Sequence, residues 1–131
     1  MTQCKQSSFE FEAHFRREVV ASFDGGALTS DAGALLLRQV DRRMGFLRRL
    51  AACFTDFRSP WLTQHGVEQM LAQRVYALAL GYEDLNDHDQ LRHDPLMGVL
   101  AGTREPDQPL ASKSTLCRLE RTPARGGERD R

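Results

Sequence analysis

The stretch Ala79-Leu-Gly-Tyr-Glu-Asp-Leu-Asn-Asp-His-Asp-Gln-Leu-Arg-His-Asp-Pro95 decides how this chain folds, because it ends one helix and delimits the next. Gly81 can end a helix, since glycine adopts the left-handed conformation of a helix end without strain. Asp84 can cap the following helix by accepting a hydrogen bond from a first-turn N–H group, and Pro95 stops that helix. These signals predict short helices joined by tight turns, and hence a mainly α fold.

The helix before this stretch carries the strongest hydrophobic pattern of the sequence. We expect it over residues 63–80, where apolar residues recur at helical spacing and residues 75–80 are apolar nearly all round. A helix that is apolar all round is buried among other elements. It is therefore predicted to be the most buried element, with Leu71 and Leu78 in the core.

The regions on either side add shorter elements. In chain order these are at most a short β-hairpin near residues 19–28, helices at 31–44 and 46–54, a helix at 84–94, a turn at 96–100 and a last helix at 115–120. Ser30 is the expected N-cap of the first helix, and Ser112 or Ser114 that of the last, because a hydroxyl can accept a first-turn N–H. Leu36 completes the predicted core.

The two ends of the chain are predicted to lie outside the helical core. Residues 1–13 are polar with scattered aromatic residues and are expected to form a flexible arm. Residues 121–131 contain no large apolar residue, so they cannot pack and are expected to be a disordered tail. The small helical domain is thus expected at residues 14–120.

Composition excludes several classes of protein. A chain of 131 residues with 40% hydrophobic residues is about one soluble domain, and its net charge of zero gives no whole-chain case for nucleic acid. The three cysteines lack a CxxC pair, which argues against a disulfide framework and a zinc module and fits a reducing cytoplasm. The longest apolar run, residues 75–80, is far too short to span a bilayer.

Positive charge is concentrated between residues 38 and 49. This segment contains Arg38, Arg42, Arg43, Arg48 and Arg49, with Asp41 as its only acid. One interpretation is a solvated helix face. The other is contact with DNA phosphates, because arginine makes planar, bidentate hydrogen bonds to phosphate. Two short helices separated by a tight turn also allow a helix-turn-helix hypothesis.

Negative charge is concentrated between residues 83 and 94. His88 and His93 are five residues apart and do not share a helical face, as a pair of metal ligands on one helix would. Asp84 and Asp87 are better explained as helix-capping groups. We therefore expect neither a metal ligand nor a catalytic residue here, and we expect Trp61 to anchor a loop rather than to stack on bases.

Three segments together resemble the N-terminal region of bacterial insertion-sequence transposases of the DDE type. They are Phe23 to Arg38, His65 to Pro95 and Leu110 to Glu120. The resemblance implies cutting and joining of DNA at element ends by three acidic residues that hold Mg²⁺ or Mn²⁺ on an RNase H-like domain. None of these acids maps onto this sequence, so no cofactor is expected in this chain. The family continues with asparagine where Arg121 stands, which suggests a truncated or frame-disrupted copy without the catalytic domain.

The resemblance and the arginines together predict a truncated transposase region that binds double-stranded DNA, at the element's terminal repeats, without catalysis of its own. The alternatives are a protein-interaction module, which packs on the missing catalytic domain or on a second protomer, and an inert remnant. Much exposed apolar surface on the helix at 64–80 would favour a missing partner. The full-length protein is a possible homo-oligomer, with no membrane partner, in the bacterial cytoplasm and at the nucleoid when bound.

Overall fold

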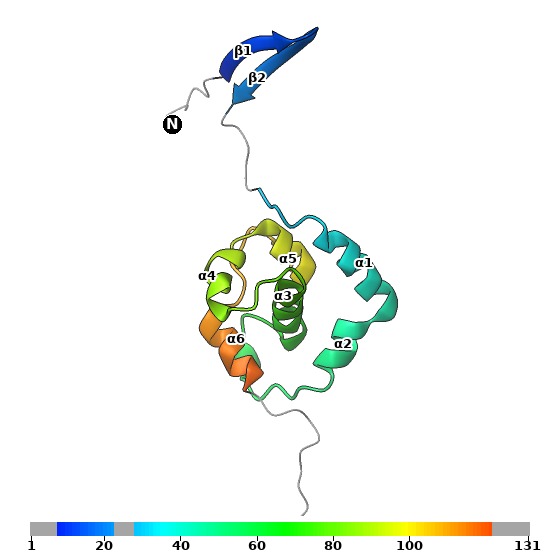
Figure 1. Ribbon diagram of the computed structural model, residues 1–131. Helices are drawn as coiled ribbons and strands as arrows, with labels where there is room; N and C mark the ends of the chain where they lie inside the picture. The colour runs from blue at the N-terminus through cyan, green and yellow to red at the C-terminus, as the bar shows by residue number, and fades with distance from the viewer. Residues whose placement is uncertain (1–7, 23–27, 122–131) are drawn as a thin grey trace, which may run out of the picture.

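The computed structural model describes residues 8–22 and 28–121, and the fold is mainly α-helical, as predicted (Figure 1). The elements are β1 (Ser8–His14), β2 (Arg17–Ser22), α1 (Ala34–Met44), α2 (Phe46–Ala51), η1 (Pro60–Leu62), α3 (Val67–Ala79), η2 (Leu85–Asp87), α4 (His88–Leu91), α5 (Pro95–Ala101) and α6 (Lys113–Glu120), where η marks a 3₁₀ helix. Figure 1 shows α3 at the centre with the other helices arranged around it.

The central helix α3 carries the core. It buries Met70, Leu71, Ala72, Gln73, Tyr76 and Ala77 and contacts α2, α5 and α6. The prediction for Leu71 is confirmed, since it packs with Leu116 and Leu119 of α6. The prediction for Leu78 is wrong, because its side chain is 46% exposed. Leu78 lies two turns beyond Leu71 on the same helical face, where it belongs to neither buried cluster of the described residues.

Helix α5 contributes more to the core than the sequence predicted. Only a turn was expected at residues 96–100, yet α5 buries Leu96, Met97, Gly98, Leu100 and Ala101. Pro95 stands in its first turn, and the Asp94 carboxylate accepts a hydrogen bond from the Leu96 N–H at 2.8 Å. Proline suits the first turn because its missing N–H would have no helical partner there. The same proline that ends the region of α4 therefore begins α5.

Helices α1 and α2 meet at Gly45, whose φ of 64° is left-handed, and this turn accounts for the predicted break between the helices expected at 31–44 and 46–54. The prediction that Ser30 caps α1 is wrong, because α1 begins at Ala34. The Thr29 hydroxyl instead accepts the Asp31 N–H at 3.2 Å and donates to Asp94 at 2.9 Å. The segment before α1 is thus tied to the start of α5.

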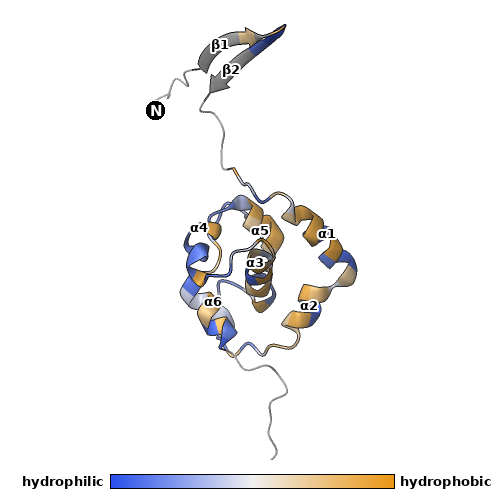
Figure 2. Cartoon of the chain, in the orientation of Figure 1, coloured by the Kyte–Doolittle hydropathy of each residue, from blue (hydrophilic) through white to orange (hydrophobic). Residues whose placement is uncertain are grey.

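Leu36 is also not a core residue. Its side chain is 73% exposed, and the only buried residue of α1 is Ala34. The reason is that α1 covers the bundle with one narrow side and leaves its remaining sides to solvent. Figure 2 shows that the first turns of α1 are nevertheless hydrophobic while its last part is hydrophilic, whereas α3 and α5 are largely hydrophobic.

The β-hairpin lies earlier in the chain than predicted. The strand expected after residue 19 is part of β2, but its antiparallel partner is β1, with Phe9 opposite Ala21 and Phe11 opposite Val19. Residues 8–13, expected to be flexible, show the alternation of aromatic and acidic residues that a strand requires. The turn expected at residues 24–25, the remainder of the arm and residues 122–131 lie outside the described residues. No helix in the described part of the chain is long and apolar enough to cross a membrane.

Candidate nucleic-acid interface

The arginines predicted to contact DNA lie on the outer helices α1 and α2. Arg42 and Arg43 stand in the last turn of α1, and Arg48 and Arg49 in the last turn of α2. All four are exposed, whereas Arg38 is half-buried. The two pairs lie on either side of the Gly45 turn, and residues 42–49 contain all four arginines.

The only acid of this segment is used within the fold. One Asp41 carboxylate oxygen accepts the Leu47 N–H at 2.9 Å, and the Asp41 carbonyl accepts the Gly45 N–H at 2.6 Å. Asp41 therefore satisfies backbone donors at the start of α2 instead of pairing with an arginine. Five arginines against one acid leave residues 38–49 with four net positive charges.

None of the five arginines forms an ion pair with another residue of the described ranges. The ion pairs found there join Arg58 to Asp56, Arg74 to Glu120 and Lys113 to Asp89. Cations in the last turn of a helix are stabilised by the negative end of its dipole, which accounts for part of their presence. The dipole does not occupy the guanidinium N–H groups, which can still meet an external anion, apart from the Arg49 Nε–H, which donates to the Gly45 carbonyl at 3.4 Å. Phosphate is the anion that arginine binds in a bidentate manner.

Arg38 marks the inner edge of this basic surface. It lies near Tyr76 of α3, whose burial raises the pKa of the phenol; Asp41 adds to this rise and Arg38 opposes it. A half-buried guanidinium reaches an external phosphate less easily than an exposed one. Arg42, Arg43, Arg48 and Arg49 are therefore the better placed of the five.

The helix-turn-helix hypothesis for α1 and α2 is wrong. That motif joins its helices by a turn of about three to four residues, whereas Gly45 alone separates these two. Figure 1 shows α1 and α2 following one another along the outside of α3. The exposed arginines therefore lie in the last turns of two consecutive outer helices, and we call this surface the basic edge.

Acidic side chains of the segment 83–94 have structural roles. The Asp84 carboxylate accepts the Asn86 N–H at 2.8 Å, which confirms the predicted cap and, with the Asn86 side chain, lowers the pKa of Asp84. Asp87 makes no capping hydrogen bond through its side chain, so that prediction is wrong. Asp89 pairs with Lys113 at 2.7 Å.

The described residues do not fit the divalent metal that the resemblance implies. Within residues 8–22 and 28–121 no group of three histidine, cysteine, aspartate or glutamate side chains could hold a metal ion. His88 is fully buried and faces the amide nitrogen of Gln73 at 3.2 Å, while His93 is exposed. The two histidines therefore lie in different environments and do not converge on a common metal site.

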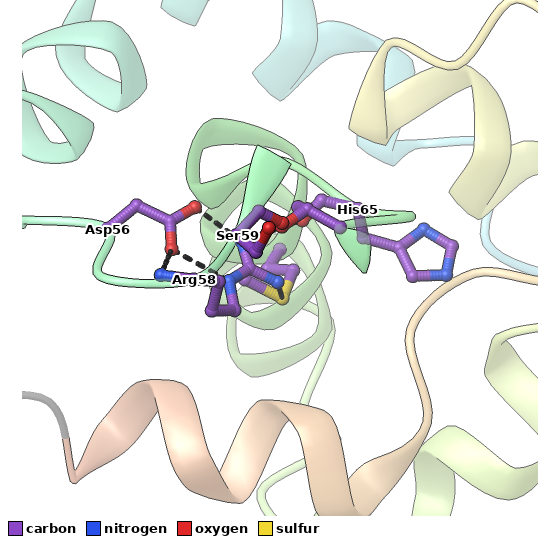
Figure 3. A network of polar contacts seen from close by, with 6 residues as sticks. Asp56, Arg58, Ser59 and His65 are labelled. Atoms are coloured by element: carbon purple, nitrogen blue, oxygen red, sulfur yellow. Dashed lines mark hydrogen bonds and ion pairs between the residues drawn. The ribbon is translucent and has the colours of Figure 1, made fainter. Parts of the chain in front are cut away.

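A second polar site, which the sequence did not reveal, organises the loop between α2 and α3 (Figure 3). Arg58 donates to both Asp56 carboxylate oxygens at 2.8 and 2.7 Å and to the His65 carbonyl at 2.8 Å. The hydrogen bond from Arg58 lowers the pKa of Asp56, and burial lowers the pKa of His65. An arginine two residues after an aspartate and before a proline was the available signal.

The same loop borders a hollow of about 350 Å³ against α6 and carries exposed hydrophobic side chains. Phe57, Trp61 and Leu62 are 80%, 91% and 86% exposed. The prediction that Trp61 anchors the loop is wrong, since Arg58 fixes it instead. Cys53 is exposed and Cys117 half-buried, and both are free thiols.

The family model described as transposase DDE domain group 1 matches residues 11–130. Because this match covers nearly the whole chain, the chain belongs to that transposase family. The comparisons with curated proteins and with solved structures gave no match.

Proposed function

We propose that this domain binds double-stranded DNA during DNA transposition, at the terminal repeats of its element. The observation that carries the proposal is the set of arginines at the ends of α1 and α2, which have no ionic partner in the described part of the chain. Their one acidic neighbour, Asp41, is bound to backbone N–H groups. Membership of a transposase family supports DNA as the polyanion that these side chains would meet.

Arginine–phosphate contacts hold a duplex without reading its sequence. Each contact releases counterions, so the affinity falls steeply as salt concentration rises. We therefore expect weak, strongly salt-dependent binding to any duplex. Preference for the terminal repeats requires further contacts to base edges or a sequence-dependent DNA shape.

Fluorescence anisotropy of a labelled duplex at several salt concentrations tests this proposal. Replacing Arg42 and Arg43 together by alanine should weaken binding to all sequences alike and lower the salt slope by about two, about one for each phosphate contact. The matched control replaces Arg104 and Arg121, which are also exposed but lie outside α1 and α2. Equal losses of DNA affinity in both double variants would show that α1 and α2 are not the interface. Binding would then depend only on the number of positive charges.

We further propose that this chain alone does not cut DNA. Phosphodiester cleavage with two metals needs carboxylates that converge on the ions, and Asp84 and Asp94 already bind backbone N–H groups. A supercoiled plasmid should stay intact with Mg²⁺ or Mn²⁺. Nicking that disappears in the Asp87→Ala, Asp89→Ala double variant would contradict this proposal and assign those two acids to chemistry.

An interaction module is the second candidate, and one observation favours it. The helix expected to reveal a missing partner, α3, exposes only Leu78 among its large apolar residues, whereas α1 exposes Leu36, Val40 and Met44. A reducing cytoplasm remains the proposed location, with free thiols at Cys53 and Cys117 in its support.

A further inference from the structure

Three apolar side chains form a row along the exposed side of α1. Leu36, Val40 and Met44 are four residues apart, which places them on one helical face. Their side chains are 73%, 53% and 60% exposed. The row extends for about 12 Å, since a helix rises about 1.5 Å per residue.

Beside this row lies a hollow between α1, α2 and α3. Its volume is about 210 Å³, and apolar side chains line it except at Asp41 and the Tyr76 hydroxyl. Val40 and Met44 line the hollow as well as belonging to the row, and Phe46 of α2 and Ala79 of α3 close it from the other sides. The row and the hollow together form one apolar groove, named here the α1 groove.

The geometry of the α1 groove suits a helix as its occupant. Exposed apolar residues that are scattered singly need no explanation, but a contiguous row beside a hollow marks an interaction site. A row at four-residue spacing is complementary to the apolar face of an amphipathic helix, whose anchors recur at three- and four-residue intervals. The lining of the groove contains no basic side chain, so it offers no cation to the phosphates of a nucleic acid.

Charge identifies the chemistry of that helix. Helices α1 and α2, which line the groove, carry five arginines, at positions 38, 42, 43, 48 and 49. Asp41, the only acid of α1 and α2, is bound to the Leu47 N–H. A second copy docked by the same groove would bring its own arginines against these, which repel. We infer that the α1 groove binds an amphipathic helix of another protein segment whose apolar face is flanked by carboxylates.

This inference is distinguishable from DNA binding, because it depends on the apolar face of α1, although arginines of α1 and α2 contribute to both proposals. Calorimetry with a synthetic helical peptide of about 14 residues, or four turns, tests it. One peptide carries leucine on one face and glutamate on its flanks, and a matched peptide carries lysine in place of glutamate. The glutamate peptide should bind at least about tenfold more tightly than the lysine peptide, a difference of about 1.4 kcal/mol.

Val40→Gln should weaken binding of the glutamate peptide at least about tenfold, and it should leave the salt-dependent affinity for DNA unchanged. Phe57→Gln is the control, because Phe57 is exposed on the loop away from the groove. Absence of peptide binding, or equal binding by the wild type and Val40→Gln, would overturn the inference. So would self-association in sedimentation that Val40→Gln abolishes, since the occupant would then be a second copy.

Discussion

Helices α5 and α1 carry five and six apolar residues, respectively, but have opposite surroundings. α5 has seven residues and buries five of them, whereas α1 has eleven and buries only Ala34. α5 lies between α3 and the following loop, where Met97 is completely buried. α1 carries leucine, valine and methionine on a side that faces solvent. Apolar periodicity therefore specifies that a helix forms, but it does not specify whether another element covers that helix.

If α5 is covered and α1 is not, the largest effect on stability should come from truncating a core side chain of α5. Met97→Ala removes a fully buried side chain and should lower the free energy of unfolding by about 2–5 kcal/mol. Leu36→Ala, on the exposed side of α1, should change it by less than about 0.5 kcal/mol. Urea unfolding followed by circular dichroism measures both. Similar losses in the two variants would show that α1 is covered after all.

A smaller effect is predicted where α5 meets its loop. A Cβ atom at Gly98 would lie 2.6 Å from the Pro106 Cα atom and 2.7 Å from its carbonyl oxygen. Gly98→Ala must therefore displace backbone atoms. We expect it to lower the free energy of unfolding, measured by thermal unfolding, by about 1–3 kcal/mol. At Gly33, before α1, a Cβ would meet nothing within 4 Å. Gly33→Ala should be neutral or slightly stabilising; a large loss there would contradict the open surroundings of α1.

The bundle is also predicted to respond to acid through His88. The Gln73 amide nitrogen donates to the Ala111 carbonyl at 3.0 Å and faces His88 Nδ1 at 3.2 Å. Nδ1 must therefore accept, which requires neutral imidazole. Burial lowers the pKa of His88, and Arg74 lowers it further, against Asp87 and Glu120.

In the unfolded chain His88 binds a proton below about pH 6.5, while the folded chain resists protonation. The contribution of His88 to stability should thus be complete well above that pH, and stability should fall as the pH drops below about 6.5, because the unfolded chain then binds the proton that the folded chain resists. His88→Asn should flatten this dependence in urea unfolding. His65, whose pKa burial also lowers, is the control: if His65→Asn removes the whole dependence, the assignment to His88 is wrong.

The smallest effect on stability is predicted for the basic edge. Replacing Arg42 and Arg43 by alanine should change the free energy of unfolding by less than about 0.5 kcal/mol, because both are exposed and lack ion pairs with the described residues. The same variant should lose DNA affinity. A substantial loss of stability, measured by urea unfolding, would show that the arginines support the fold instead of forming a separate surface.

Local signals predicted much of this fold. Gly45 as a helix break, Asp84 and Ser112 as caps and the buried Leu71 are confirmed, because each depends on neighbouring residues or on a long hydrophobic pattern. Leu36 and Leu78 were misplaced because their exposure depends on which distant segments pack nearby. No local pattern contains that information.

The candidate site was only partly predictable for the same reason. Clustered arginines are visible in the sequence, but their lack of ionic partners depends on Asp41 bonding to the Leu47 N–H. The α1 groove could not be foreseen, since it requires α3 residues such as Ala79 beside Val40. Arg58 was missed because its partners, Asp56 and the His65 carbonyl, meet only when the loop closes.

Backbone amide NMR of the chain, recorded with and without a duplex at low salt, tests the central claim most directly. If the basic edge is the DNA interface, shifts should concentrate in residues 38–51 of α1 and α2. The amides of α5, which is mostly buried, should stay unchanged. Shifts concentrated in α6 or in the loop around Trp61, with α1 and α2 unaffected, would contradict the account.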